Sequence, residues 1–147
     1  EKVVQSSSLP YTILRISGVA MPAFLAPPEP WPFMREQRME FVARDDVVRA
    51  LARSVEEPGA RGKVFNIAGG ESWQMLGHEY VACFNEVMGL DPEDARYLDS
   101  AGYYDWYDTG EGQALLGYQE TSFGQFLELM RKAIREALGL DREEEEW

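Results

Sequence analysis

Two arginines are the side chains best suited to bind an anion. Arg38 stands just before an apolar segment, and Arg96 stands ahead of an aromatic one. A guanidinium grips a phosphate or a carboxylate with two parallel hydrogen bonds, so both are candidate substrate ligands. Arg35 and Arg44 compete with Arg38 for this role. A solvated surface arginine is an equally good interpretation of Arg38.

A group of aromatic residues offers a second kind of contact. It comprises Tyr103, Tyr104, Trp106 and Tyr107. Such rings could stack on a sugar or a base, and Trp106 is the candidate substrate ligand among them. The commoner role of such a group is to anchor a short segment against the core.

The acids, the histidine and the cysteine give weaker signals. Asp45 and Asp46 directly precede an apolar-periodic segment, where acids satisfy the free amides and the dipole of a helix N-terminus, so we predict capping rather than catalysis. His78 has no Cys or His partner at ligand spacing, and no metal site is expected. Cys83, the only cysteine, allows no internal disulfide and is interpreted as core packing.

The elements that must position these residues alternate between strands and helices. Tyr11–Ile16 and Lys63–Ala68 are short apolar runs typical of buried strands. A helix is predicted from Asp45 up to Pro58, because its apolar positions follow the 3.6-residue period. The stretch from Met21 to Pro32 holds five prolines, which predicts an irregular loop with a function.

Three more helices are predicted in the second half of the chain. The first begins at Ser72 as its cap, carries Trp73 and Tyr80 on one face and ends near Met88. The second lies between the Asp108–Thr109 cap and Gly117. The third begins with the Ser-x-x-Gln spacing of a capping box at residues 122–125 and ends at Gly139.

The predicted strands are too few for a complete sheet. Strand–helix–strand–helix order implies parallel pairing, and two or three short parallel strands with apolar character on both faces cannot form a stable sheet alone. We therefore expect residues 1–147 to be a single fragment, whose open edge at Tyr11–Ile16 pairs with a missing N-terminal half or with another copy of the chain. Residues 1–5 are consistent with this, because they read as the end of a helix already under way.

Composition limits the partners. The chain has 147 residues and a formal net charge of −12, and its last seven residues form an acidic tail with five acids and one base. Nucleic acid and anionic membrane surfaces are therefore poor partners. No stretch approaches the roughly 18 apolar residues of a membrane span, and the sequence shows no signal-peptide layout. We expect a cytoplasmic protein.

Four motifs, in order, carry a family resemblance: Leu9–Arg15, Phe41–Leu51, Gly62–Gly70, and Leu115–Tyr118 followed by Thr121–Phe123. They resemble the post-catalytic half of the NAD(P)-dependent epimerase/dehydratase family, the extended short-chain dehydrogenase/reductases. The resemblance implies an α/β fold made of the last parallel strands of a Rossmann-like sheet plus a small, mostly helical substrate-binding lobe. It also implies NAD or NADP in the intact parent and a small, possibly nucleotide-sugar substrate.

The same resemblance assigns residues. Ile16, Ser17, Gly18 and Val19 correspond to the segment that passes beside the nicotinamide, and Arg38, Arg96 and Trp106 are the substrate-binding candidates. No Tyr here has a Lys four residues later, and by the resemblance the catalytic Tyr-x-x-x-Lys of the family is expected upstream. The fragment alone is expected to be inactive and to bind no cofactor tightly.

Departures from the family pattern leave an alternative open. Sugar-nucleotide epimerases commonly carry Asn, a substrate ligand, at the position of Gly18. Arg38 lies three residues before Phe41, whereas the family's phosphate-binding arginine lies two before that aromatic, and Met39 occupies the expected place. The alternative is a non-catalytic relative that senses a dinucleotide or binds a partner.

Overall fold

A computed structural model describes residues 1–140, so the predicted acidic tail lies outside the described residues. Its helices are α1 (Lys2–Gln5), α2 (Arg44–Glu56), α3 (Gly77–Met88), α4 (Gly110–Leu116) and α5 (Phe123–Leu138). Its strands are β1 (Thr12–Ile16), β2 (Gly18–Ala20), β3 (Arg38–Met39), β4 (Phe41–Ala43), β5 (Lys63–Ile67) and β6 (Met75–Leu76). Short 3-10 turns cover Pro58–Ala60, Glu71–Trp73 and Pro92–Asp94.

Two parallel strand pairs form the centre of the fold. β1 pairs with β5 from Thr12↔Lys63 to Ile16↔Ile67, and β2 pairs with β4 from Gly18↔Phe41 to Ala20↔Ala43. The chain thus changes its pairing partner at Ser17, between β1 and β2. Within residues 1–140 no strand pairs with the other edge of β1. The predicted strands, their parallel pairing and the open edge are confirmed.

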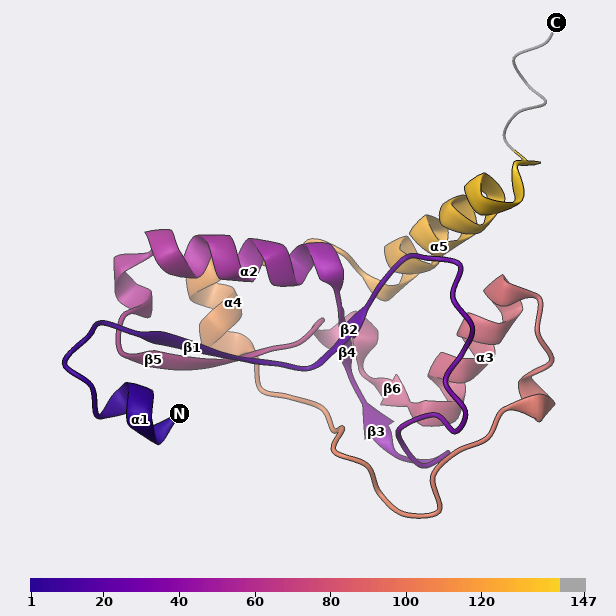
Figure 1. The fold of residues 1–147 in the computed structure, drawn as a ribbon, viewed down its shortest axis with the longest axis horizontal. Coiled ribbons are helices and arrows are strands. Elements are labelled where there is room, and N and C mark those ends of the chain that lie inside the picture. Colours follow the sequence, from indigo (N-terminus) through magenta and orange to yellow (C-terminus); the bar gives the residue numbers. More distant parts are fainter. Residues whose placement is uncertain (141–147) are drawn as a thin grey trace, which may run out of the picture.

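The helices divide the chain into two regions (Figure 1). α2 runs along the β1–β5 pair and contacts β1, while α4 contacts β5. At the other end, α3 packs against α5, and the antiparallel pair β3–β6 lies beside α3. This second region is the small, mostly helical lobe that the sequence predicts.

Each region has its own core. The core beneath α2 comprises Val42, Val47, Ala50, Ala60, Phe65, Ile67, Leu116 and Tyr118. The core of the lobe is rich in aromatic residues and includes Trp31, Phe33, Phe41, Trp73, Tyr80, Phe123 and Phe126. Many of these rings meet edge to face, as Phe41 and Tyr80 do at 5.0 Å between centroids, a geometry that the aromatic quadrupole favours.

The predicted C-termini of α4 and α5 and the predicted start of α5 are confirmed, whereas Thr109 stands at the N-cap position of α4 without a side-chain cap. Gly117 and Gly139 end these helices in the left-handed conformation, at φ of 55° and 70°, which glycine adopts without steric cost. At the start of α5, Ser122 Oγ accepts a hydrogen bond from the Gln125 amide, and the Gln125 side chain accepts one from the Ser122 amide. The capping-box spacing therefore correctly predicts the N-terminus of α5.

The helix predicted to begin at Ser72 is wrong in its first turn. Residues 71–73 form a 3-10 turn, β6 follows, and α3 begins only at Gly77. Trp73 is fully buried, but its indole N–H donates to the Thr121 carbonyl 2.9 Å away, so a tertiary anchor rather than a helix face explains its apolar position. Glu79 closes the true N-terminus by accepting a hydrogen bond from the Leu76 amide at 2.7 Å.

The proline-rich stretch is irregular, as predicted, with no helix or strand longer than an isolated bridge between Ala20 and Arg38. That bridge joins Trp31 to Tyr97 and ties the stretch to the lobe. No helix in residues 1–140 is long and apolar enough to cross a membrane.

Candidate functional site

The predicted cofactor-edge segment, residues 16–19, lies where the chain passes from one strand pair to the other. The Ser17 amide donates to the Ile67 carbonyl at 2.9 Å, which extends the β1–β5 pairing by one bond. The hydroxyl of Ser17 is buried and has no hydrogen-bond partner among the described residues. Buried polar groups normally have partners, so this hydroxyl is an unused hydrogen-bonding group at the strand end.

Gly18 in that segment is required by packing. A Cβ built on it would lie 2.5 Å from the Phe41 ring and 3.0 Å from the Tyr104 ring. The space that a side chain such as Asn would use is therefore filled by aromatic carbon. The absence of Asn at this position has a physical cause within the lobe.

Two cavities flank this segment. The larger, of about 640 Å³, is lined by Pro10, Tyr11, Thr12, Leu14, Ile16, Leu51, Ser54, Val55 and Arg61. We call it the β1–α2 cavity. The smaller, of about 240 Å³, includes Val19 and Trp31 in its wall, and we call it the Trp31 cavity. Ile16 thus faces one hollow and Val19 the other.

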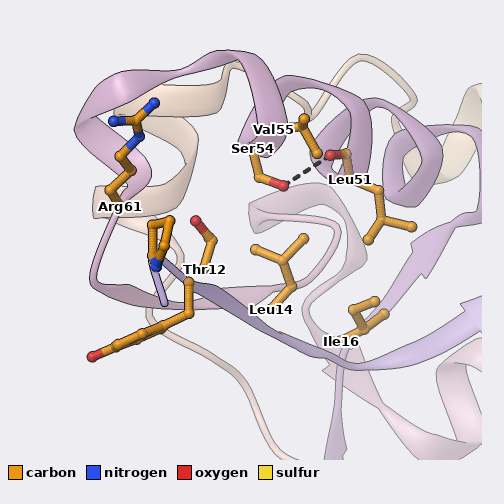
Figure 2. Close-up of a pocket in the computed structure, with 9 residues that line it drawn as sticks. Thr12, Leu14, Ile16, Leu51, Ser54, Val55 and Arg61 are labelled. Carbon is orange, nitrogen blue, oxygen red and sulfur yellow. Dashed lines mark hydrogen bonds between the residues drawn. The ribbon is translucent and has the colours of Figure 1, made fainter. Parts of the chain in front are cut away.

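The β1–α2 cavity lies between the free edge of β1 and the helix above it. Figure 2 shows Leu14 and Ile16 of the strand and Leu51 of the helix directed into this space. Leu51 is 49% exposed and Val55 is 87% exposed. Apolar side chains this exposed, next to an unpaired strand edge, mark a surface suited to cover by another protein segment.

Arg38 and Trp106 lie together, as substrate ligands would, but the arginine also forms an ion pair with Asp105. Asp105 Oδ1 lies 2.7 Å from the Arg38 guanidinium, whose carbon lies 5.1 Å from the Trp106 ring centroid. The Trp106 indole N–H donates to the Met75 carbonyl at 3.3 Å. In this arrangement the arginine holds the 105–106 segment against β3, and its charge is matched by a neighbouring acid.

Arg96 belongs to a different place. It lines a separate cavity of about 280 Å³ that includes Glu29, Asp91 and Asp94 but neither Arg38 nor Trp106. Its backbone carbonyl accepts a hydrogen bond from the Trp31 amide at 2.9 Å. The structure therefore does not bring the two predicted anion-binding arginines into one cavity.

Two residues that the sequence did not single out hold the 102–107 segment. Gln37 accepts hydrogen bonds from the Met34 and Gly102 amides and donates to the Gly102 and Tyr104 carbonyls, at 2.7–3.0 Å. Glu40 is fully buried, and its carboxylate accepts hydrogen bonds from the amides of Gly70 and Tyr107, at 2.8 and 2.9 Å. No local pattern marks either residue, because most of their partners lie far away in the sequence.

The prediction that Asp45 and Asp46 cap α2 is wrong. The helix already begins at Arg44, its N-cap position is Ala43, and no side chain caps it. Asp45 pairs with its neighbour Arg44 at 3.1 Å, whereas Asp46 is fully buried and accepts hydrogen bonds from the Glu120 and Thr121 amides. Both acids still lie in the first turn, where the helix dipole favours them, and the role of Asp46 is structural.

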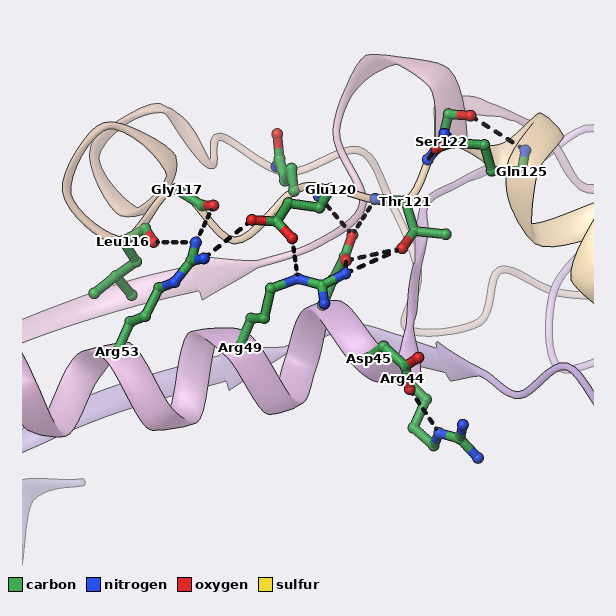
Figure 3. A network of polar contacts seen from close by, with 12 residues as sticks. Arg44, Asp45, Arg49, Arg53, Leu116, Gly117, Glu120, Thr121, Ser122 and Gln125 are labelled. Atoms are coloured by element: carbon green, nitrogen blue, oxygen red, sulfur yellow. Dashed lines mark hydrogen bonds and ion pairs between the residues drawn. The ribbon is translucent and has the colours of Figure 1, made fainter.

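A network of charges continues along α2 (Figure 3). Arg49 contacts Asp46 and Glu120, each at 2.9 Å, and Arg53 contacts Glu120 at 3.0 Å. Arg53 also donates to the carbonyls of Leu116 and Gly117, at the end of α4. The network fixes the link between α4 and α5 onto α2.

His78 and Cys83 show local contacts rather than a metal site. His78 Nδ1 lies 3.1 Å from the Arg35 carbonyl and 3.5 Å from a Glu36 carboxylate oxygen. Burial, with smaller contributions from Glu86 and Glu79, raises the pKa of the Cys83 thiol. Among residues 1–140 no three His, Cys, Asp or Glu side chains come together as metal ligands would.

Comparison with solved structures gives consistent matches. A UDP-glucose 4-epimerase of Thermotoga maritima is 22% identical, with a TM-score of 0.69, over 92% of this chain and 49% of that protein. A short-chain dehydrogenase/reductase superfamily protein of Agrobacterium tumefaciens, solved with NAD, is 16% identical, with a TM-score of 0.71, over 96% of this chain and 56% of that one. A UDP-glucuronic acid 4-epimerase of Bacillus cereus is 23% identical, with a TM-score of 0.67, over 90% and 48%.

These matches establish the fold. The chain spans about half the length of the solved structures it matches, which is consistent with a C-terminal half, and it has the α/β architecture of Rossmann-type short-chain dehydrogenase/reductase epimerases. The predicted resemblance is thus confirmed at the level of the fold. No protein family model matches the sequence, and no curated protein matches it either.

Proposed function

We propose that this chain is the substrate-binding half of an NAD(P)-dependent epimerase/dehydratase or reductase that acts on a hydroxyl or carbonyl of a small substrate. The observation that carries the proposal is the free edge of β1, because it ends in the segment that the family resemblance assigns to the nicotinamide. A dinucleotide-binding half would complete the enzyme and supply the Tyr-x-x-x-Lys motif. This chain by itself would neither turn over substrate nor bind NAD or NADP tightly.

The surface beside that edge supports such a partner. Leu51 and Val55 expose apolar area next to the β1–α2 cavity, and the strand offers unpaired backbone groups along its free edge. Covering this surface with further parallel strands and a helix would satisfy both at once. The matched structures are about twice as long as this chain, so they contain the additional length that such a cover requires.

The substrate side supports a small substrate more strongly than a nucleotide sugar. Gly18 leaves no space for an Asn side chain, and Arg38 is already paired with Asp105. Arg96 opens into a cavity with three acids, which repel a diphosphate. The usual ligands of a nucleotide sugar are therefore replaced or engaged elsewhere.

The test is to extend the reading frame upstream and purify the intact protein. We expect a Gly-rich first strand–helix turn, a Tyr-x-x-x-Lys motif, and oxidation of NADH or NADPH with a panel of small carbonyl compounds. An upstream sequence without both motifs would refute the proposal.

The exposed apolar surface beside the β1–α2 cavity, which includes Leu51 and Val55, can be tested as the docking surface for the other half within the intact protein. Val55→Asp adds a charge beside the β1–α2 cavity and should destabilise the two-half assembly, as measured by its melting temperature. Leu138→Asp is the matched control, because Leu138 is also exposed, at 56%, but lies near the end of α5. Equal effects of the two substitutions would argue against a docking role for the β1–α2 surface.

A second candidate is a non-catalytic relative that senses a dinucleotide or binds a partner. It is favoured by the Arg38–Asp105 pair, because an acid already matches the charge of this arginine. Under this alternative, the intact protein would bind NADH or NADPH in a fluorescence titration but would oxidise neither with any carbonyl in the panel.

A further inference from the structure

The Trp31 cavity is almost entirely apolar. It holds about 240 Å³ and is lined by Val19, Ala20, Met21, Ala23, Leu25, Ala26, Pro28, Trp31, Pro32, Phe41, Tyr80, Phe84 and Phe126. None of these side chains is charged. A phosphate, a carboxylate or an ammonium group would lose its hydration here without a counter-charge, so the cavity selects an uncharged group.

Two donors in the wall are unused. The Tyr80 hydroxyl and the Trp31 indole N–H make no hydrogen bond to any residue in the described range 1–140, although both residues are about 4% exposed. Burial raises the pKa of the Tyr80 hydroxyl, which keeps it protonated and able to donate at neutral pH. Neither atom is among the fully enclosed unpaired side-chain atoms of residues 1–140, so both keep some accessible surface and can donate to an oxygen acceptor of a ligand.

The outer wall of the cavity is formed by exposed apolar residues of β2 and of the proline-rich stretch. Val19, Met21 and Leu25 are 47%, 49% and 56% exposed, and all three line the cavity. Trp31, at the other end of the stretch, meets Tyr80 and Phe84 edge to face at 5.9 and 5.2 Å between centroids. The stretch thus forms one side of the hollow and the aromatic core of the lobe the other.

We infer that the Trp31 cavity binds an uncharged aromatic ring of the substrate, with an oxygen on a short substituent of that ring accepting a hydrogen bond from Tyr80. Apolar cavities of about 150 Å³ are large enough for benzene, so about 240 Å³ fits one ring with a short substituent. Edge-to-face contacts with the surrounding aromatic residues favour a ring over an alkyl chain. That the bound molecule is a substrate rests on the proposed function; that the cavity binds a ring does not.

Binding can be measured on this chain without cofactor or turnover. The probes are benzyl alcohol and ethylbenzene, which have nearly the same shape but differ in one hydroxyl. With methyl-¹³C methionine, the Met21 methyl signal should move saturably with either probe, whereas that of Met130, which lies outside the cavity wall, should stay in place. Absence of a saturable Met21 shift with both probes would overturn the inference.

Variants separate the cavity from the surrounding surface. Leu25→Ala removes part of the wall and should weaken both probes at least threefold, whereas Phe24→Ala, which alters an equally exposed neighbour outside the wall, should leave both dissociation constants unchanged. Tyr80→Phe should weaken benzyl alcohol by about twofold to tenfold and leave ethylbenzene unaltered. Equal effects of Leu25→Ala and Phe24→Ala, or of Tyr80→Phe on both probes, would contradict this assignment.

The outcome is distinguishable from that of the proposed function. If this chain binds the probes but the intact protein oxidises no NADH or NADPH, the Trp31 cavity remains a ring-binding site and the proposed enzymatic function is refuted. If the intact protein turns over substrate but this chain binds neither probe, the enzymatic function is supported and ring binding in the Trp31 cavity is refuted.

Discussion

The buried carboxylate of Asp46 accepts hydrogen bonds from both the backbone amide of Thr121, at 3.1 Å, and its hydroxyl, at 3.0 Å. These residues are 75 positions apart, and their contact joins the first turn of α2 to the segment that leads into α5. One acid therefore links the strand region to the helical lobe. The same carboxylate also meets Arg49 at 2.9 Å, which supplies a counter-charge.

We expect Asp46→Ala to lower the free energy of unfolding by about 3 kcal/mol, since it leaves the Glu120 and Thr121 amides without their acceptor and removes one of the two acids that contact Arg49. Asp45→Ala is the matched control: its side chain is 55% exposed, and its loss should change stability by less than about 0.5 kcal/mol. Urea unfolding followed by circular dichroism measures both. Equal stability of the two variants would show that the Asp46 contacts contribute nothing.

Asp46 also illustrates what a sequence can predict. The apolar periodicity of α2 and the capping box of α5 act within a few residues, so local patterns predict those elements correctly. The partners of Asp46 are set by tertiary packing, and a local rule assigned it to capping instead. Trp73 was misassigned for the same reason, because its anchor at Thr121 lies 48 positions away.

The candidate site likewise combines features that can be predicted from the sequence with features that cannot. The order of motifs predicted the strand end at residues 16–19 and the open edge of β1, since both follow from chain direction and strand number. It did not predict that Asp105 pairs with Arg38, because an ion pair between residues so far apart in the sequence follows no spacing rule. The Trp31 cavity could not be predicted from the sequence either, because its wall combines the proline-rich stretch with α3 and α5.

Gly18→Ala tests the packing at the strand end. The new Cβ would lie 2.5 Å from the Phe41 ring, so we expect a loss of about 1–3 kcal/mol in the free energy of unfolding. Gly124→Ala on α5 is the control, because the nearest atom to its Cβ lies 4.0 Å away, and a helical alanine should raise stability by up to about 1 kcal/mol. If Gly18→Ala leaves the free energy of unfolding unchanged in urea unfolding, the Phe41 and Tyr104 rings move aside at little cost.

Asp105→Asn tests whether the ion pair masks an anion site. Removing the carboxylate frees the Arg38 guanidinium, so we expect pyrophosphate to bind about twofold to fivefold more tightly than to the unmodified chain. Isothermal titration at low ionic strength measures the change. The gain should vanish in the Arg38→Gln, Asp105→Asn double variant. An affinity unchanged by Asp105→Asn would show that Arg38 serves only to hold the 105–106 segment.

Tyr118 should make the fold sensitive to alkali. Its buried hydroxyl donates to the Ala68 carbonyl at 2.8 Å and accepts from the Ala68 amide at 3.1 Å, at the end of β5. Burial raises the pKa of this hydroxyl, an effect that its hydrogen bonds with Ala68 and Gln119 partly offset. A raised folded-state pKa means that the folded chain holds its proton more tightly than the unfolded chain. The associated stability is therefore complete below the unfolded value of about 10 and is lost as the pH rises through the folded value.

We expect the free energy of unfolding to fall as the pH rises above the unfolded value of about 10, and to fall less steeply in Tyr118→Phe, because that variant has no proton to lose at this site. At pH 8 the same variant should be less stable by about 1–2 kcal/mol, since the two hydrogen bonds between this hydroxyl and Ala68 are lost. Tyr103→Phe, at a fully exposed position, is the control and should follow the unmodified chain at every pH. Parallel pH profiles for Tyr118→Phe and Tyr103→Phe, measured by urea unfolding, would exclude Tyr118 as a source of the alkaline loss.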